Sequence, residues 1–478
     1  MNKPVQPQVA APSAYRCFAP YVLPALLLGG LALRLLFLWV GAALYYQGKS
    51  PFTNNDSHSF TQSFVNLLEL GTYTFDPNTP DAAFGRLPGF PFFWGGHYLL
   101  FGKHYVYQAV AFTQILLDTA AIYLVYATTR AITQDIRAAW VSGLLYAGYP
   151  FIIVWLTISG SEALATFMTI LVFWWLATQP SAPRSALAAG VLVGISFMVR
   201  EYLGILILGA FFWVYATKGL SWHSVRLSVV VTAGFMMIYL GWPLRNYVGQ
   251  HRFIPVKTLN AGYERYAEDV ISARQWIYAW TTDSDPYLNG IAGRTPLPPL
   301  PAGVLADSAE ARQLQALIRQ AQQCGTGFYN WHHERRYALP TNCNAEVAAG
   351  FDALRSSYRR RFPVQYHTRV PLLNLQRAFF KSRLQREGST GQLAALLFGY
   401  RSVLLLLGVA GAFLLRHRRA TWPITFFFAF LYLFLCFLVR HLEIRYLLQA
   451  DTVILCLAGV PLVKSWDWLR RQLAPSRA

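Results

Sequence analysis

Charged residues are scarce in this chain, since only 13% of its 478 residues are Asp, Glu, Lys or Arg. Soluble domains carry about 25% charged residues, so the composition excludes an ordinary soluble protein. Acidic residues are the scarcest, with 22 Asp and Glu against 41 Lys and Arg and a formal charge of +19. The basic residues lie at the ends of apolar runs and in one long polar segment, not in a stripe on a compact domain. This distribution argues against nucleic-acid binding.

Cysteines are also few, with five in the chain. Those in or beside apolar runs are expected to be small buried hydrophobes: Cys17, Cys436 and Cys456. Cys324 and Cys343 lie in a polar segment, and if that segment is outside the cytoplasm a disulfide is expected, contributing about 3 kcal/mol. A zinc site is the alternative, because His332 and His333 lie between the two cysteines. Adjacent histidines rarely point at the same ion, which disfavours it.

Motifs for nucleotides and metals are lacking. The sequence has no Walker loop and no convincing dinucleotide fingerprint, which argues against a nucleotide-sugar donor. Its histidines are scattered, so it predicts no metal site and leaves any divalent-metal cofactor unknown. We find no internal repeat, which weighs against transporter folds built from inverted halves.

Apolar runs dominate what is present, since 55% of the residues are hydrophobic. Runs of about twenty residues match the length that an α-helix needs to cross roughly 30 Å of hydrocarbon. Lipid offers no hydrogen-bond partners, so such runs must be helical. The first run is longer than the apolar stretch of a signal peptide, and we expect it to be retained as a span. The sequence thus predicts an all-α polytopic membrane protein with about ten transmembrane helices: 19–45, 105–129, 138–156, 161–178, 185–199, 202–217, 226–243, 391–415, 421–439 and 446–465.

Basic residues in the short connections predict the orientation. By the positive-inside rule, these connections and both termini face the cytoplasm. The residues concerned are Arg130, Arg137, Arg184, Lys218, Arg226, Arg416, Arg418, Arg419, Arg470 and Arg471. Two large extracytoplasmic loops follow, at about 46–104 and 244–390. We therefore expect an N-terminal membrane module over 1–243, an external domain over 244–390 and C-terminal transmembrane helices over 391–478.

An acidic residue, Asp56, lies just after the first predicted span, at the head of an amphipathic helical pattern that includes Phe60. A carboxylate in this position could act at the membrane surface. The alternative is structural, with Asp56 or Ser57 capping the helix by accepting its free N–H groups.

Short motifs recur in order along the membrane part of the chain. They are Asp56-Ser57 with Phe60, Gly71-Thr72-Tyr73, Arg86-Leu87-Pro88-Gly89-Phe90-Pro91, Gln114 with Asp118, Ser161-Glu162, Trp242-Pro243-Leu244-Arg245-Asn246-Tyr247 and Arg445-Tyr446-Leu447-Leu448. In this order, over roughly residues 20–260 and 395–465, the sequence resembles the bacterial GT-C glycosyltransferases related to protein O-mannosyltransferases and aminoarabinose (lipid A) transferases. The loop 244–390 carries no such resemblance.

The resemblance implies a GT-C fold in the bacterial cytoplasmic (inner) membrane. It implies inverting transfer of a sugar from a polyprenyl-phosphate donor to an extracytoplasmic glycan, lipid or protein. Asp56 would be the general base for the acceptor hydroxyl, a contribution of about 10²–10⁴-fold. Protein O-mannosyltransferases have an Asp-Glu pair in this loop, whereas Ser57 follows Asp56 here. Glu162 is the candidate for a second carboxylate, with a substrate-orienting or structural role as the alternative.

A phosphate leaving group needs cations, because its negative charge grows as the glycosidic bond breaks. Arginine suits this role, since it stays charged and forms paired hydrogen bonds with phosphate oxygens. The candidates at external helix ends are Arg86, Arg200, Arg245, Arg440 and Arg445. As structural alternatives, Arg200 could pair with Glu201 and Arg440 could extend to the membrane interface.

Other functions also fit the sequence. A flippase or transporter for lipid-linked sugars would explain the external arginines, but it requires polar residues near mid-membrane. Arg34 and Asp118 are the main ionisable residues in the predicted spans. A ligase or polymerase that moves a whole glycan from a diphosphate carrier is a further alternative.

Overall fold

The computed structural model describes residues 13–54, 56–78, 80–257, 267–333, 339, 341–380, 389–440 and 442–473, and this part of the chain is helical, with no strand. The α-helices are α1 (Ser13–Leu36), α2 (Ala42–Tyr46), α3 (Ser57–Leu70), α4 (Gly89–Thr133), α5 (Ile136–Ala147), α6 (Pro150–Ile153), α7 (Ser161–Thr178), α8 (Pro183–Val199), α9 (Leu206–Lys218), α10 (Trp222–Tyr239), α11 (Gly241–Gln250), α12 (Glu268–Ile277), α13 (Asp285–Ile291), α14 (Ser308–Cys324), α15 (Thr326–His333), α16 (Asn344–Arg361), α17 (Val370–Phe380), α18 (Ser389–Leu414), α19 (Trp422–Leu433) and α20 (Ile444–Leu473). Short 3-10 or π segments are η1 (Phe37–Gly41), η2 (Pro80–Phe84), η3 (Glu201–Ile205), η5 (Gln365–Arg369), η6 (Arg419–Thr421) and η7 (Phe434–Val439).

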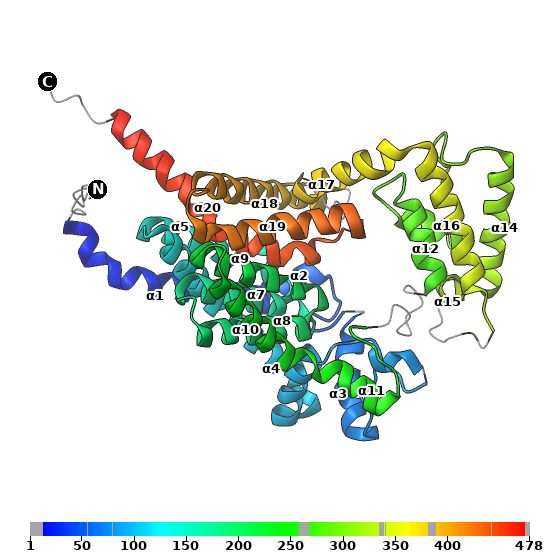
Figure 1. The fold of residues 1–478 in the computed structure, drawn as a ribbon, viewed down its shortest axis with the longest axis horizontal. Helices are drawn as coiled ribbons and strands as arrows, with labels where there is room; N and C mark the ends of the chain where they lie inside the picture. Colours follow the sequence, from blue (N-terminus) through cyan, green and yellow to red (C-terminus); the bar gives the residue numbers. More distant parts are fainter. Residues whose placement is uncertain are drawn as a thin grey trace.

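A bundle of apolar helices forms the larger part of the molecule, and α12–α16 form a separate module at one end of it (Figure 1). In the described part of the chain, seven helices are long and apolar enough to cross a membrane. Each of the ten predicted spans contains helix, but those predicted at 138–156, 185–199 and 202–217 correspond to shorter helices, which are α5 with α6, α8 and α9. The protein is therefore an all-helical integral membrane protein, with fewer long spans than the sequence predicts.

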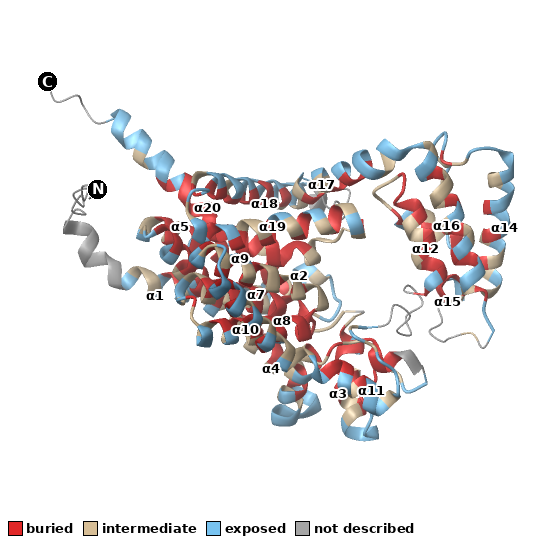
Figure 2. Ribbon diagram, viewed as in Figure 1, coloured by how far each residue is buried: buried red, intermediate tan, exposed pale blue. Residues whose placement is uncertain are grey.

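Helix α20 is the centre of the bundle. Within the apolar window of α20, 83% of the residues are buried, against 17% for the first span, Tyr21–Tyr46. Figure 2 shows the same contrast between the buried interior and the exposed outer helices. The backbones of α18 and α20 approach closely at Gly411 of α18. A side chain there would prevent this, because its Cβ would lie 2.0 Å from the carbonyl oxygen of Leu457 in α20.

Helix α4 begins earlier than the predicted span and is broken at Gly102, whose φ of 67° is left-handed. Only glycine adopts such a φ without steric cost. His97 spans the break, because its ring nitrogens contact the carbonyl of Phe93 and, at 2.8 Å, the hydroxyl of Thr113. The segment before Gly102 is therefore a distinct helix of the first external loop, and His97 holds it to the membrane span.

Buried ion pairs connect the membrane helices. Arg34 of α1 contacts Asp118 of α4 at 2.6 Å, and both side chains are almost fully buried. Tyr146 of α5 also donates to Asp118. Each charge is thus neutralised inside the bundle, so these ionisable residues serve packing between three helices.

A further buried pair, Arg401 with Asp451, was not singled out from the sequence, although both residues lie within predicted spans. The Arg401 Nε donates to Asp451 at 2.8 Å, and its other donors reach the Ala378 carbonyl and the Tyr432 hydroxyl. Tyr149 donates to the same carboxylate at 2.8 Å. This network joins α17, α18, α19 and α20.

Two arginines of the basic connections contact the ends of membrane helices. Arg137 contacts Asp467 at 2.6 Å, so the start of α5 lies beside the end of α20. Arg418 donates to the Ile132 carbonyl at the end of α4. These contacts place Arg137 at the end of α20 and Arg418 at the end of α4.

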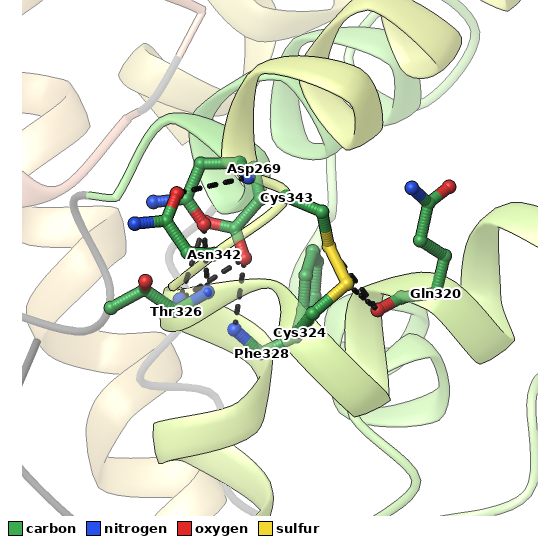
Figure 3. The surroundings of a disulfide bond; sticks show 9 residues. Asp269, Gln320, Cys324, Thr326, Phe328, Asn342 and Cys343 are labelled. Carbon is green, nitrogen blue, oxygen red and sulfur yellow. Dashed lines mark hydrogen bonds between the residues drawn. A yellow bond between two sulfur atoms is a disulfide. The ribbon is translucent and has the colours of Figure 1, made fainter. Parts of the chain in front are cut away.

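The external module has its own hydrophobic core, which includes Trp276, Phe328 and Phe351. A disulfide joins Cys324 at the end of α14 to Cys343 before α16 (Figure 3). Cys436 and Cys456 are free and buried, and the side chain of Cys17 lies outside the described residues.

Asp269 secures α15 next to the disulfide. Its carboxylate accepts from the backbone N–H groups of Gly327 and Phe328 at 3.0 and 3.2 Å (Figure 3). Burial raises the pKa of Asp269 to about 6, although these hydrogen bonds favour the ionised form. The residues of the alternative zinc site have other partners, since Cys324 and Cys343 are joined in the disulfide and His332 contacts the Ala292 carbonyl at 2.8 Å.

Removing Asp451 tests the buried network. Asp451→Ala leaves the Arg401 charge buried without its counter-ion, and we expect the free energy of unfolding to fall by about 3–5 kcal/mol. Asp467→Ala is the matched control, because that carboxylate is 34% exposed and such a pair contributes roughly 0–1 kcal/mol. Thermal denaturation in lipid nanodiscs measures both variants. Equal midpoints would contradict a stabilising role for the buried pair.

Candidate active site

Asp56 occupies the N-cap position of α3, but its side chain does not cap the helix. The Asn54 side chain performs that task, accepting at 3.0 Å from the backbone N–H groups of Asp56 and Ser57. The structural alternative for Asp56 is therefore not what the chain adopts. Its carboxylate is left to face other side chains.

Asp56 forms an ion pair with Arg445, which lies 389 positions further along the chain. The Arg445 Nη1 is 2.5 Å from the Asp56 Oδ2, and the Arg86 Nη2 is 3.7 Å from Oδ1. The Asp56 side chain remains 32% exposed. The carboxylate thus lies between guanidinium groups from distant segments and is still accessible.

Arg445 lies in the first turn of α20, among carboxylates. Besides Asp56, its Nε is 2.6 Å from Glu443 and its Nη1 is 3.8 Å from Glu162. A cation at a helix N-terminus is opposed by the helix dipole. The acidic residues around it offset that cost and fix the guanidinium at the end of the bundle.

Glu162 and Arg200 form a buried pair beside this cluster, at 2.5 Å. Glu162 is in the first turn of α7, and Arg200 follows α8. The sequence alternative that pairs Arg200 with Glu201 is wrong, because Glu201 contacts Lys257 instead. Lys257 holds the pKa of Glu201 at about 2, despite the opposing effect of burial.

Arg200 extends the cluster toward α20. Its Nη1 donates to the Tyr202 hydroxyl at 3.2 Å, and Tyr202 in turn donates to Gln449 at 2.9 Å. Arg200 is therefore linked to α20 through Tyr202 and Gln449, and Arg445 belongs to α20 itself.

Arg86 lies on the opposite side of Asp56. Its Nε donates to the Ser59 hydroxyl at 2.8 Å, and its guanidinium carbon lies 4.1 Å from the centre of the Phe60 ring. Ser59 and Phe60 belong to the first turn of α3. The motif that carries Arg86 thus folds back on the helix that begins beside Asp56.

The remaining arginine candidates contact backbone carbonyls. Arg245 donates to Tyr73 at 2.7 Å and to Ala83 at 3.0 Å, which ties α11 to the first external loop. Arg440 donates to Tyr278 at 3.2 Å and to Tyr366 at 2.8 Å in the external module. The contacts described for Arg245 and Arg440 do not include Asp56.

The arginines lower the pKa of Asp56. Burial alone would raise this pKa, but the charges of Arg445 and Arg86 outweigh it and hold the pKa below its ordinary value. Asp56 is therefore ionised at neutral pH. Among the residues that the structure describes, no group of three or more His, Cys, Asp or Glu side chains could hold a metal ion.

Glu443 is the member of the cluster that the sequence did not single out. It lies in the short segment between Arg440 and Arg445. Its carboxylate is 2.6 Å from Arg445, slightly longer than the 2.5 Å ion pairs of Asp56 with Arg445 and of Glu162 with Arg200. The unusual charge of that short external turn is the signal that could have identified it.

Carbodiimide labelling tests the ionisation of Asp56, because the reagent modifies protonated carboxyls. We expect half-maximal labelling of Asp56 below pH 3.8, its ordinary pKa, since Arg445 and Arg86 favour the carboxylate. Arg445→Gln removes one of these charges while burial remains, so the midpoint should move to higher pH. Mass spectrometry of the modified peptide gives both values, and an unchanged midpoint in Arg445→Gln would contradict the ion pair.

Comparison with known proteins found a family match for part of the chain. A model of the family described as dolichyl-phosphate-mannose-protein mannosyltransferase matches residues 81–242. The matched segment contains Arg86, Glu162 and Arg200. No curated protein matches the chain.

The fold is similar to that of the archaeal oligosaccharyltransferase AglB from Archaeoglobus fulgidus, solved with an inhibitory peptide and a dolichol-phosphate. The identity is 15% and the TM-score 0.52, over 98% of this chain and 53% of that chain. The same enzyme tethered to an acceptor peptide gives a TM-score of 0.53 at 15% identity, over 97% of this chain and 52% of that one. The chain thus spans about half the length of the oligosaccharyltransferase.

A third structure is the aminoarabinose transferase ArnT from Cupriavidus metallidurans bound to undecaprenyl phosphate, at 15% identity over 93% of this chain and 80% of that one. Its TM-score of 0.37 is too low to bear on the fold. The chain therefore has a helical membrane fold similar to that of the oligosaccharyltransferase, and its segment 81–242 resembles the dolichyl-phosphate-mannose-protein mannosyltransferases.

Proposed function

We propose that the protein is an inverting glycosyltransferase that moves one sugar from a polyprenyl-phosphate carrier to an acceptor hydroxyl outside the cytoplasm. The observation that carries this proposal is the ion pair of Asp56 with Arg445, partly exposed at one end of a membrane bundle. It places a base beside a cation that suits phosphate. Transfer of a sugar from a lipid phosphate requires both groups.

The position of the cluster supports an extracytoplasmic site. Asp56 and Arg445 lie at one end of the bundle, whereas Arg137 and Arg418 lie at the other. Cationic connections mark the cytoplasmic face of bacterial membrane proteins. The site would then face outward from the bacterial inner membrane, where lipid-linked sugars are the available donors.

Asp56 acts as the general base in this proposal. Its carboxylate takes the proton of the acceptor hydroxyl while the hydroxyl oxygen forms a bond to the anomeric carbon. The bond from that carbon to the phosphate oxygen breaks, and its electron pair leaves with the phosphate. A positioned base contributes about 10²–10⁴-fold.

Arg445 and Arg86 stabilise the departing phosphate. Both guanidinium groups already lie within 3.7 Å of the Asp56 carboxylate, and both side chains are partly exposed. Arginine stays protonated and presents paired N–H donors that match phosphate oxygens. Each can therefore meet the negative charge that grows as the glycosidic bond breaks.

Glu162 and Arg200 act indirectly. Glu162 is 3% exposed and already paired with Arg200, so we assign it the positioning of Arg445 rather than proton transfer. Arg245 and Arg440 hold loops through backbone carbonyls and serve the architecture of the site.

The donor class rests on likeness. The oligosaccharyltransferase of similar fold was solved with a dolichol-phosphate, which is a polyprenyl-type lipid phosphate. A hydroxyl-bearing glycan, lipid or protein is the acceptor, and the external module α12–α16 lies on the same side of the bundle as the site (Figure 1). Membrane lipid surrounds the apolar helices.

Substitution of Asp56 tests the mechanism. Asp56→Asn keeps the shape but removes the base, and we expect turnover of a polyprenyl-phosphate sugar to fall by at least about 10²-fold. Asp467→Asn is the control, since it removes an arginine-paired carboxylate from the other end of the bundle and should keep full activity. The measurement is glycosidic product formed by purified protein in nanodiscs. Full activity of Asp56→Asn would refute the assigned base.

The products separate this proposal from its alternatives. A polyprenyl monophosphate by-product is expected from the wild type. A diphosphate lipid would indicate a ligase or polymerase, and transfer of the lipid-linked sugar across vesicle membranes without glycosidic product would indicate a flippase.

A further inference from the structure

We infer that the donor phosphate and Asp56 compete for one guanidinium, that of Arg445, so that binding of the donor releases Asp56 from its ion pair. This inference rests on the proposed function and adds an order to it. The donor must bind before the base becomes available to the acceptor.

The first step of the argument is how Arg445 uses its donors. Its Nη1 is held by Asp56 at 2.5 Å and its Nε lies 2.6 Å from Glu443. The Nη2 makes a long contact, 3.4 Å, with the Tyr446 hydroxyl. A phosphate binds a guanidinium through two parallel N–H donors. The negative charge of Glu443 lies beside Nε and repels a phosphate on that side, so the edge that can accept a phosphate is formed by Nη1 and Nη2, and Asp56 occupies half of it.

The second step is that the carboxylates around Arg445 are not equally exchangeable. Glu162 is 3% exposed and has Arg200 as a partner at 2.5 Å. Glu443 is two positions from Arg445 and contacts the Nε, away from the Nη edge. Asp56 is 32% exposed and belongs to a different segment of the chain. A phosphate that arrives from outside therefore displaces Asp56, while Glu162 and Glu443 keep the guanidinium in place.

The third step is the consequence for chemistry. While Asp56 is bound to Arg445, its lone pairs are engaged and its basicity is reduced by the neighbouring positive charge. Once the phosphate neutralises Arg445, Asp56 retains Arg86 at 3.7 Å and gains basicity. Asp56 is thus a weak base before the donor binds and a stronger base once the donor phosphate is bound.

Binding of the product lipid tests the exchange without any turnover. Undecaprenyl phosphate in nanodiscs should bind Asp56→Asn about fivefold more tightly than the wild type, because one partly exposed ion pair no longer competes. Arg445→Gln should lose binding. The double variant Asp56→Asn with Arg445→Gln should bind like Arg445→Gln, since without the guanidinium there is nothing to compete for.

Matched ligands and variants define the outcomes. Undecaprenol, which lacks the phosphate, should show no gain in Asp56→Asn, and Asp467→Asn should bind undecaprenyl phosphate like the wild type. An equal gain for undecaprenol would overturn the inference. So would unchanged or weaker binding of undecaprenyl phosphate by Asp56→Asn.

Failure of the inference and failure of the proposed function are distinguishable. Wild-type turnover without tighter binding by Asp56→Asn rejects the exchange and keeps the glycosyltransferase. Tighter binding through Arg445 without any turnover supports the exchange and rejects the proposed reaction.

Discussion

A charged side chain inside a membrane bundle is stable only where a counter-charge and hydrogen bonds meet it, and the pairing of arginine with carboxylate organises this protein. In the interior, Arg34 with Asp118 and Arg401 with Asp451 are fully enclosed and join helices. At the outer end the same chemistry is left partly open, at Asp56 and Arg445. The interior pairs hold the helices together, and the partly exposed pair is accessible to a ligand from outside the bundle.

Helix α20 contributes to both the buried ion pairs and the partly exposed pair. Its first turn carries Arg445, Asp451 follows six residues later, and its last part carries Asp467, which meets Arg137 at the far end of the bundle. The packing that buries α20 therefore also fixes the position of Arg445 along the bundle and the orientation of its guanidinium. The electrostatics of the site depend on apolar contacts along a helix of thirty residues.

Sequence reasoning identified what local patterns determine. The length of the apolar runs predicted helices in every span, and motif order singled out Asp56 and Arg445 separately, whose catalytic roles remain predictions. It missed Arg401 and Asp451, because one charge in a run of about twenty apolar residues barely alters the average hydropathy. The alternative it offered for Arg200, a pair with the adjacent Glu201, is wrong, since packing selects Glu162, a partner far away in the sequence.

Arg440 adopts a left-handed backbone conformation, with φ of 59°, at the end of η7. Its side chain donates hydrogen bonds to the Tyr278 and Tyr366 carbonyls, and Arg445 follows five positions later in the chain. The backbone at the end of η7 is therefore fixed to the end of α12 and to η5, so a displacement of either segment would act directly on Arg440.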